Sequence, residues 1–587
     1  MSALLIDQKG STQVEPISGA VPLLQTYLLE EDSDVPAYTI VETINSHYPD
    51  VSGIIIQVCL KCKSYPNLQD CWGLEILKEI RANKTFGADI NRLRFLPVIL
   101  ILHLPVQRMI SINRGNMLAL GTGIKRIHAP FGPQDLDLES VKRENPFLLE
   151  EFRDSIQVEI NLIQDRHDCS NFFAAIQTLR LYCALFPEAA AREGLRKLYS
   201  LRSREIRAVQ TAFGFDDYPP GLLRNTGNLL WKLRRGLVKS SAGEKARFKK
   251  IALIDDQSDR IHIRLGLGWK YIYDWLLYDN EAGVEIIDSM ENPEVIAEKV
   301  SAGFDLVLLD LHLEPKDVQQ PAAATKGALV LKALRKKAPM IPVIMTTASR
   351  NPEKHKALRV LGSDGSWIKE NIDERLSAEK SAARIISLVE MAAKLTDKQY
   401  SLLTKSFLLL DKMKTKTLWW ENWEWISERD GVASRIEPNK GIIFSKLTHG
   451  LLQFRELLQN KLLEEGFYVK NDESSRIAAI ITLLGGIFEA FHSVYQGSSL
   501  SSAMEHRKDY LGKLLYRMRN QAAHFRSGAP LDFSFFERFL KGLFCYLLFP
   551  PPGEDFHKRN FNWRTPDLEA LLGNQPGFRE IYHNYFS

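Results

Sequence analysis

The chain has 587 residues, so several domains are expected, because single hydrophobic cores stop growing well below that length. A hydrophobic fraction of 45% and a charged fraction of 25% exclude disordered, collagen-like and mucin-like proteins. The formal net charge of +4, from 76 basic and 72 acidic side chains, gives no global nucleic-acid signature, so any contact with RNA or DNA must be local.

The N-terminal sequence MSALLIDQKG has no basic region followed by an apolar stretch, and the apolar run FLPVILILHLP is too short to span a bilayer. We therefore expect a cytoplasmic protein without a membrane partner. The six cysteines are few for this length, which favours reduced thiols. Cys59, Cys62 and Cys71 form an incomplete zinc pattern, because no second close pair or neighbouring histidine supplies the missing ligands.

Two segments, 1–130 and 249–370, resemble each other in five blocks that follow the same order. The blocks pair ALLIDQ (3–8) with IALIDDQ (251–257), SGIIIQVCL (52–60) with DLVLLDLHL (305–313), GLEILKEIR (73–81) with GALVLKALR (327–335), LPVILILH (96–103) with IPVIMTTAS (341–349), and LGTGIKRIH (120–128) with LGSDGSWIK (361–369). Short apolar runs separated by segments of helical period are typical of buried parallel strands joined by crossover helices. Each copy is therefore predicted to be a flavodoxin-like, doubly wound α/β domain.

Ligand sites in such sheets lie beyond the carboxyl ends of the strands, so the residues that follow each apolar run are candidates for chemistry. In the first copy these positions hold Asp7, Gln57, Leu102 and His128. Residues 136–245, which come next, carry leucine, arginine and glutamate at helical spacing and predict a helical connector.

In the second copy the strand ends hold Asp255 and Asp256, then Asp310, Thr347 and Lys369. This set resembles the response-regulator receiver family at each of its marker positions. The resemblance implies that Asp310 accepts a phosphoryl group from a histidine kinase or another phosphodonor. It also implies that Lys369 neutralises the phosphoryl charge and that the hydroxyl of Thr347 follows the phosphate.

Three convergent carboxylates repel one another, so a hard divalent cation, most plausibly Mg²⁺, is expected between Asp255, Asp256 and Asp310. By family position the backbone carbonyl of His312 is a further metal ligand. Glu370 stands where the family usually has proline, and Ser366 replaces a common aromatic residue, for which Trp367 is the candidate substitute.

Measured against the same family, the first copy lacks the acceptor, because Gln57 occupies the position of Asp310. Leu102 replaces Thr347, His128 replaces Lys369, and only Asp7 remains of the acidic pair. We interpret this copy as a pseudo-receiver that serves packing or partner recognition, with nucleotide or ligand sensing as the alternative.

The C-terminal third is predicted to be helical, with a linker over 396–440 and four antiparallel helices within 441–467, 474–496, 504–526 and 531–549. The third helix carries RNQAAH, with Arg519, Asn520 and His524. A bare R-x4-H pattern also occurs at Arg350–His355, so the spacing alone proves nothing.

Within a four-helix unit, RNQAAH resembles the site of the HEPN family, whose metal-independent ribonucleases carry this motif. The resemblance implies that His524 moves a proton, that Arg519 holds the phosphate and that Asn520, one helical turn away, orients His524. Arg519 and His524 lie about 140° apart around one helix, so the family's composite site across a homodimer axis is expected, with Ala522 and Ala523 allowing close approach.

Five domains follow: a pseudo-receiver (1–135), a helical connector (136–245), a receiver (246–395), a helical linker (396–440) and a HEPN-like domain (441–587). The expected function is metal-independent RNA cleavage gated by phosphorylation of Asp310, in a bacterial stress or phage-defence pathway by resemblance. The alternative is a non-enzymatic signalling scaffold whose bundle dimerises and binds a partner. A DNA-binding regulator is disfavoured, because no basic recognition helix is evident.

Overall fold

The computed structural model describes residues 2–9, 17, 21, 23–30, 35–60, 71–82, 91–121, 123–144, 166–187, 193–215, 217–239, 247–256, 268–278, 283–301, 303–349, 351–371, 374, 377–414, 440–463, 474–486, 510–523 and 531–548. The chain divides into two compact units. One comprises residues 1–337 and 343–393, and the other residues 338–342 and 394–587. No helix within the described ranges is long and apolar enough to cross a membrane.

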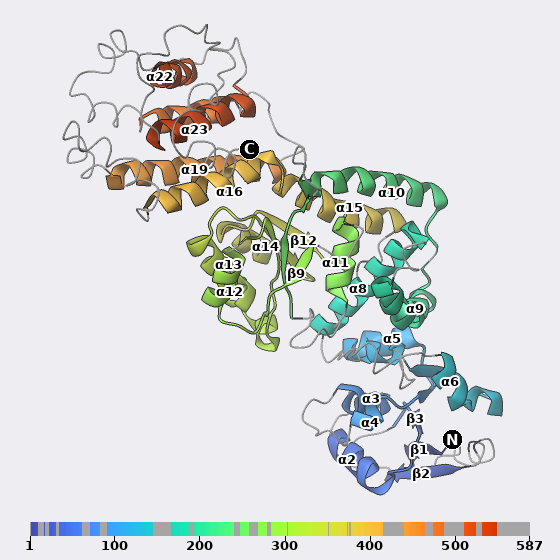
Figure 1. Ribbon diagram of the computed structural model, residues 1–587. Helices are drawn as coiled ribbons and strands as arrows, with labels where there is room; N and C mark the ends of the chain where they lie inside the picture. Colours follow the sequence, from blue (N-terminus) through green and yellow to red (C-terminus); the bar gives the residue numbers. More distant parts are fainter. Residues whose placement is uncertain are drawn as a thin grey trace. The chain divides into compact units, whose positions relative to one another are not determined.

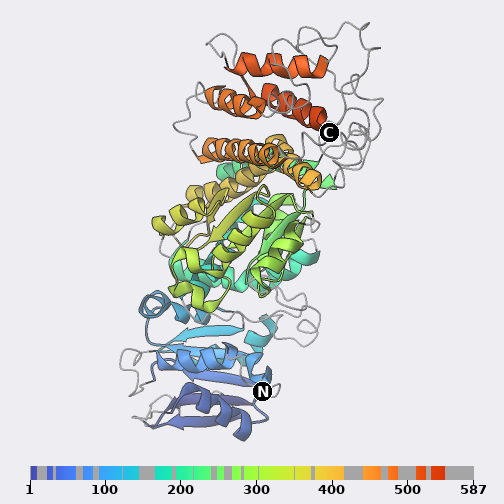
Figure 2. The same cartoon turned by 90° about the vertical axis from the view of Figure 1, so that its left-hand side faces the viewer.

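The first α/β domain, blue in Figure 2, contains a five-stranded parallel sheet in the order β2-β1-β3-β4-β5. Its strands are β1 (Ala3–Gln8), β2 (Leu24–Leu29), β3 (Gly53–Gln57), β4 (Val98–Leu102) and β5 (Ile124–His128). The helices of this domain are α2 (Ala37–His47), α3 (Trp72–Ala82), α4 (Asn91–Arg94) and α5 (Val106–Ile112), and the 3₁₀ segment η3 (Arg114–Leu120) precedes β5. Every residue of β3 and β4 is buried, which explains their uninterrupted apolar sequences.

The connector is helical, as its sequence predicts. Its described helices are α6 (Leu138–Glu144), α8 (Arg166–Leu185), α9 (Glu193–Phe213) and α10 (Pro220–Arg234). Helix α8 is buried along most of its described length, whereas α9 and α10 alternate buried and exposed positions. A short antiparallel pair, β6 (Val238–Lys239) with β7 (Arg247–Phe248), forms at the end of this region.

The second α/β domain, yellow-green in Figure 1, repeats the topology of the first, with a parallel sheet in the order β12-β11-β10-β8-β9. Its strands are β8 (Ile251–Ile254), β9 (Val284–Ile286), β10 (Leu306–Asp310), β11 (Val343–Thr347) and β12 (Gly365–Ile368). Its helices are α11 (Trp269–Tyr278), α12 (Pro293–Ser301), α13 (Lys326–Lys337), α14 (Pro352–Val360) and α15 (Ala378–Leu395). In chain order both sheets have the arrangement 2-1-3-4-5.

Equivalent residues of the two copies make equivalent contacts. Arg81, at the end of α3, donates to the carbonyl of Gly123, and its repeat partner Arg335 on α13 donates to the carbonyl of Gly362 at 2.7 Å. Each arginine thereby ties a helix to the loop that precedes the fifth strand. Burial lowers the pKa of Arg81 to about 9, although three backbone carbonyls accept from its guanidinium.

A glycine at the start of α13 allows this helix to approach β10 closely. A Cβ added to Gly327 would lie 2.2 Å from the carbonyl oxygen of Asp310, and one added to Gly73 would lie 2.2 Å from that of Gln57. These are repeat-equivalent positions, so the repeat preserves the same helix-to-strand contact in both domains.

Replacing Gly327 with alanine is therefore expected to destabilise the second domain by about 1–3 kcal/mol, the usual cost of overpacking. Differential scanning calorimetry should show a lower Tm for its transition. Gly227, inside α10, is the matched control, because an added Cβ there meets nothing within 4 Å and alanine should stabilise the helix by about 0.5–1 kcal/mol. Equal effects of the two substitutions would contradict the close contact.

The second unit is helical, as predicted. Its described helices are α16 (Lys398–Lys414), α19 (Lys440–Leu463), residues 474–486, α22 (Tyr510–Ala523) and α23 (Phe533–Leu548). Phe454 on α19 stacks on Phe536 of α23 with ring centroids 4.1 Å apart. The side chain of Leu484 packs against Gly450, and that of Arg519 on α22 packs against Gly485. Aromatic stacking and small residues therefore join these helices, α19, 474–486, α22 and α23, in one core.

Candidate functional site

Three acidic side chains converge at the carboxyl edge of the second sheet. Asp255 and Asp256 follow β8, and Asp310 ends β10, the strand that pairs with β8. Carboxylate oxygens from all three lie within 4.8 Å of one another. Asp255 and Asp310 are fully buried and Asp256 is partly buried. Within the described ranges, this is the one grouping of acidic, cysteine or histidine side chains close enough to share a metal ion.

Lys369, one residue past β12, completes the cluster. Its Nζ donates to Asp310 Oδ2 at 2.6 Å and to Asp255 Oδ2 at 3.0 Å, and it lies 4.8 Å from the ring centroid of Trp269. Burial of the ammonium favours a lower pKa, but the charges of Asp255 and Asp310 outweigh it and raise the pKa of Lys369 above its ordinary value. The lysine is therefore charged and fully paired in this pocket.

The donor set fits a hard divalent cation. Three carboxylates against one ammonium leave an excess of two negative formal charges in a buried site. Oxygen ligands of this kind suit Mg²⁺, and neither cysteine nor a histidine side chain takes part. Asp255, Asp256 and Asp310 are thus the residues that could hold the ion.

Thr347 and His312 flank the acidic cluster. Thr347 is buried at the end of β11; its carbonyl accepts from the backbone N–H of Lys369 at 2.8 Å, and its Oγ1 accepts from that of Ser349 at 3.1 Å. The backbone N–H of His312 donates to Asp310 Oδ1 at 3.3 Å, and its Nε2 lies 3.3 Å from Lys354 Nζ. The signalling role of Thr347 and the metal-binding role of the His312 carbonyl stay predictions.

Asn171 is a site residue that sequence reasoning missed. It lies on α8 of the connector, is fully buried, and its Oδ1 accepts from Lys369 Nζ at 3.0 Å. The helix therefore closes the acidic pocket, in which Asp310 and Lys369 have no exposed surface. Nothing in the local sequence marks Asn171, because its partner is 198 residues away.

Helix α8 also contacts Glu370, the residue that replaces the usual proline. Burial raises the pKa of this carboxyl, and Ser381, Arg384, Gln177 and Arg180 oppose the rise to a smaller extent. Gln177 and Arg180 belong to α8, so two consecutive residues after β12, Lys369 and Glu370, engage the connector.

Trp367, the candidate substitute for the aromatic residue of the family, is buried in the second α/β domain. Trp367 is 2% exposed, lies edge-on to Trp269 and Tyr273, and donates its indole N–H to the Arg384 carbonyl at 2.9 Å. This packing makes Trp367 a core residue, and its substitution for the aromatic residue of the family stays a prediction. Ser366 bonds to His355 Nδ1 at 2.7 Å, which gives the histidine of the second R-x4-H pattern a structural role.

The long loop between β10 and α13 is organised by a buried carboxylate. Asp317 accepts backbone N–H groups from Leu313, Glu314 and Lys326 at 3.0–3.1 Å. Lys326 in turn forms an ion pair with Glu314 at 2.9 Å. The loop beside Asp310 is thus a fixed structure built from its own residues.

The corresponding edge of the first sheet has a different chemistry. Gln57 is buried and its Nε2 lies 2.6 Å from His103 Nε2, so an amide–imidazole pair stands where the second copy has Asp310. Leu102 is buried, His128 is exposed, and Asp7 is the carboxylate that remains. This side-chain set offers no equivalent of the Asp310 acceptor.

The structure describes two of the three residues expected to cleave RNA. Arg519 and Asn520 lie near the end of α22, where Arg519 Nη1 donates to Asn520 Oδ1 at 2.8 Å. His524 lies outside the described residues, as do Cys62 and Arg350. Ala522 is 3% exposed and packs inside its own chain, so of the two expected contact residues only Ala523 is exposed.

A scan against protein-family models gives no match for this chain. A search among curated proteins gives no significant match either. The functional interpretation therefore depends on the geometry of the acidic pocket and on the sequence motifs.

Proposed function

We propose that the protein is a phosphorylation-controlled regulator in which Asp310 accepts a phosphoryl group and the C-terminal helical domain is a HEPN-type, metal-independent ribonuclease. The observation that carries the proposal is the buried network of Asp255, Asp310 and Lys369. The 2-1-3-4-5 strand order supports a flavodoxin-like receiver fold for both α/β domains.

Phosphoryl transfer at this site forms one bond to phosphorus and breaks one. A carboxylate oxygen of Asp310 attacks phosphorus and forms a new O–P bond, while the bond from phosphorus to acetate in acetyl phosphate, or to the histidine nitrogen of a kinase, breaks. Bound Mg²⁺ would supply positive charge to the transferred oxygens from its place among Asp255, Asp256, Asp310 and the His312 carbonyl. Lys369, already 2.6 Å from Asp310, pairs with one of the same oxygens.

The contact between Lys369 and Asn171 links this chemistry to the connector. A phosphoryl group on Asp310 offers Lys369 stronger acceptors than the neutral amide of Asn171. It also needs space in a pocket that α8 closes. Phosphorylation is therefore expected to release α8 locally, which is the change that the rest of the chain would detect.

Replacing Asn171 with alanine is expected to speed phosphorylation of Asp310 by acetyl phosphate about tenfold. The physical reason is that a hydrogen bond to a charged group, worth about 1.5–3 kcal/mol, no longer holds the closed pocket. A time course on phosphate-affinity gels measures the rate, and Asn225→Ala at an exposed position of α10 is the control. An unchanged rate would show that α8 does not limit access.

The proposed output is metal-independent cleavage of RNA, in which the 2′-oxygen forms a bond to the adjacent phosphorus while the bond from phosphorus to the 5′-oxygen of the next nucleotide breaks. His524 would take the proton from the 2′-hydroxyl or give one to the leaving 5′-oxygen, Arg519 would hold the phosphate as negative charge develops, and Asn520 would orient the histidine. Two copies of α22 meeting across a homodimer axis would complete the site. A histidine kinase as phosphodonor and a role in bacterial stress or phage defence follow from the two family resemblances.

The deciding experiment combines both activities in one protein. Purified protein and an Asp310→Asn variant are treated with acetyl phosphate and Mg²⁺, then mixed with EDTA and total RNA. We expect cleavage that survives EDTA and changes with phosphorylation in the wild type alone. The same change in Asp310→Asn would show that the acceptor is elsewhere.

A second candidate, a non-enzymatic scaffold, is favoured by two observations on α22. Ala522 is buried in its own chain, and Arg519 already engages Asn520. If phosphorylation alters dimerisation, measured by light scattering, while RNA stays intact in every state, the bundle is a partner-binding module.

A further inference from the structure

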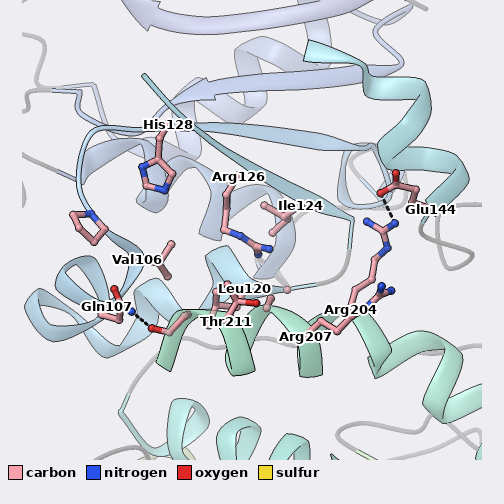
Figure 3. Close-up of a pocket in the computed structure, with 14 residues that line it drawn as sticks. Val106, Gln107, Leu120, Ile124, Arg126, His128, Glu144, Arg204, Arg207 and Thr211 are labelled. Carbon is pink, nitrogen blue, oxygen red and sulfur yellow. Dashed lines mark hydrogen bonds and ion pairs between the residues drawn. The ribbon is translucent and has the colours of Figure 1, made fainter. Parts of the chain in front are cut away.

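A cavity of about 650 Å³ opens between the first α/β domain and helix α9 of the connector (Figure 3). Its walls come from β5, from the segment that precedes it, from the start of α5 and from one face of α9. Gln107 donates to the carbonyl of Ala212 at one end, and Glu144 pairs with Arg204 at the other. The volume falls within the range of small-molecule sites, about 300–1,000 Å³.

Positive charge gathers in this cavity. Arg126 projects from β5 toward α9, and Arg204 and Arg207 come from α9 itself (Figure 3). Glu144 is the one acidic residue among the lining residues, and with 55% exposure its ion pair with Arg204 is a surface interaction that an incoming anion can replace at small cost. The Nε of Arg204 is buried without a hydrogen-bond acceptor in the described structure.

The guanidinium groups of Arg126 and Arg204 repel each other. Burial lowers the pKa of Arg126 to about 10, and the nearby charge of Arg204 contributes to the decrease. Among the described residues, the guanidinium of Arg126 bonds to the Ala119 carbonyl at 2.9 Å, which uses one of its five N–H donors. An anion between Arg126 and Arg204 would relieve this repulsion and accept hydrogen bonds from the remaining N–H groups of the two guanidinium groups.

Four further lining residues are apolar: Pro105, Val106, Leu120 and Ile124. A free phosphate would fill a small part of the volume and leave these side chains without a contact. A ligand with both a charged end and an apolar body matches this mixed lining.

We propose that this cavity binds a nucleotide, with its phosphates between Arg126 and Arg204 and its base against the apolar lining residues. His128, the repeat equivalent of Lys369, lines the same cavity, so the site lies beside the edge at which the first copy has Gln57 in place of an acceptor aspartate. The ligand would touch both β5 and α9 and would thereby fix the first domain to the connector. This proposal does not depend on phosphorylation of Asp310 or on RNA cleavage.

The test is isothermal titration calorimetry of the full chain with ADP, pyrophosphate and adenosine, in EDTA so that metal at the acidic pocket plays no part. We expect ADP to bind at least tenfold more tightly than pyrophosphate and adenosine, because ADP alone contacts both the arginines and the apolar lining residues. Arg126→Ala and Arg204→Ala should each weaken ADP binding about tenfold or more, as expected for loss of a charged hydrogen bond.

Two further variants separate binding from folding. Thr211→Trp fills the cavity from the exposed side of α9 without removing charge and should abolish ADP binding, whereas Arg224→Ala on exposed α10 should leave it unchanged. Absence of ADP binding at millimolar concentration would overturn the proposal. So would ADP binding that survives both Arg126→Ala and Thr211→Trp, or pyrophosphate binding as tight as that of ADP.

Discussion

Replacing Lys369 with methionine is expected to lower the free energy of unfolding of the second α/β domain by about 3–5 kcal/mol. Methionine keeps most of the side-chain volume but removes the ammonium that bonds to Asp255 and Asp310, both of which are fully buried. Breaking a buried ion pair by removing one partner carries this cost, because the remaining charges lose both solvent and counter-ion. The same variant should lose phosphoryl transfer to Asp310.

Hydrogen exchange of the β8 and β10 amides measures this loss in the full-length chain, where a single unfolding transition is not expected. Lys356→Met, at an exposed position of α14, is the matched control and should change protection little. Added Mg²⁺ should restore much of the lost protection, since an ion that binds only the folded site stabilises it in proportion to the logarithm of its concentration. Unchanged protection in Lys369→Met would contradict the buried network, and protection that Mg²⁺ fails to restore would argue against a metal among the three aspartates.

Replacing Arg519 with alanine is expected to lower the rate of RNA cleavage at least about 100-fold. The proposed site offers Arg519 as the group that stabilises the charged phosphate, and removal of one such donor commonly costs about 10²–10³ in rate. His524→Ala should have a comparable effect, because it removes the proton-transfer group. Initial rates on a labelled RNA, in EDTA, measure both changes.

The matched control is Arg517→Ala on the same helix, two residues away and exposed, which should keep the wild-type rate. Arg519 also packs its side-chain stem against Gly485, so Arg519→Lys tests whether packing alone is responsible. If Arg519→Lys keeps the packing against Gly485 but loses cleavage, the result supports the phosphate-binding role of Arg519, because lysine does not reproduce the planar guanidinium fork. Full activity in Arg519→Ala would remove this residue from the mechanism.

Much of the architecture was predictable from the sequence because each element leaves a local pattern. Runs such as VILIL (98–102) and LVLL (306–309) are buried on both faces, which favours uninterrupted apolar residues. The carboxyl ends of neighbouring parallel strands meet at one edge, so the predicted meeting of Asp255, Asp256, Asp310 and Lys369 needed only the strand order. The helices of the C-terminal third follow in the same way from apolar residues at helical spacing.

Local patterns failed wherever a distant segment determines the environment of a residue. The sequence suggested that Trp367 substitutes for an aromatic residue of the receiver family and that Ala522 lines a dimer contact, but it did not indicate that both side chains are buried within their own units. Burial depends on which helices pack nearby, and spacing along one helix or strand does not specify that choice.

The sequence by itself determined two repeated parallel sheets, the residues at their carboxyl edges and a helical C-terminal region, because these depend on periodicity and on neighbours along the chain. Only the tertiary structure decided that α8 places Asn171 on Lys369 and that α9 brings Arg204 near Arg126. Both arrangements join segments that are far apart in sequence. Their geometry depends on how whole elements pack, for which a single sequence carries no local signal.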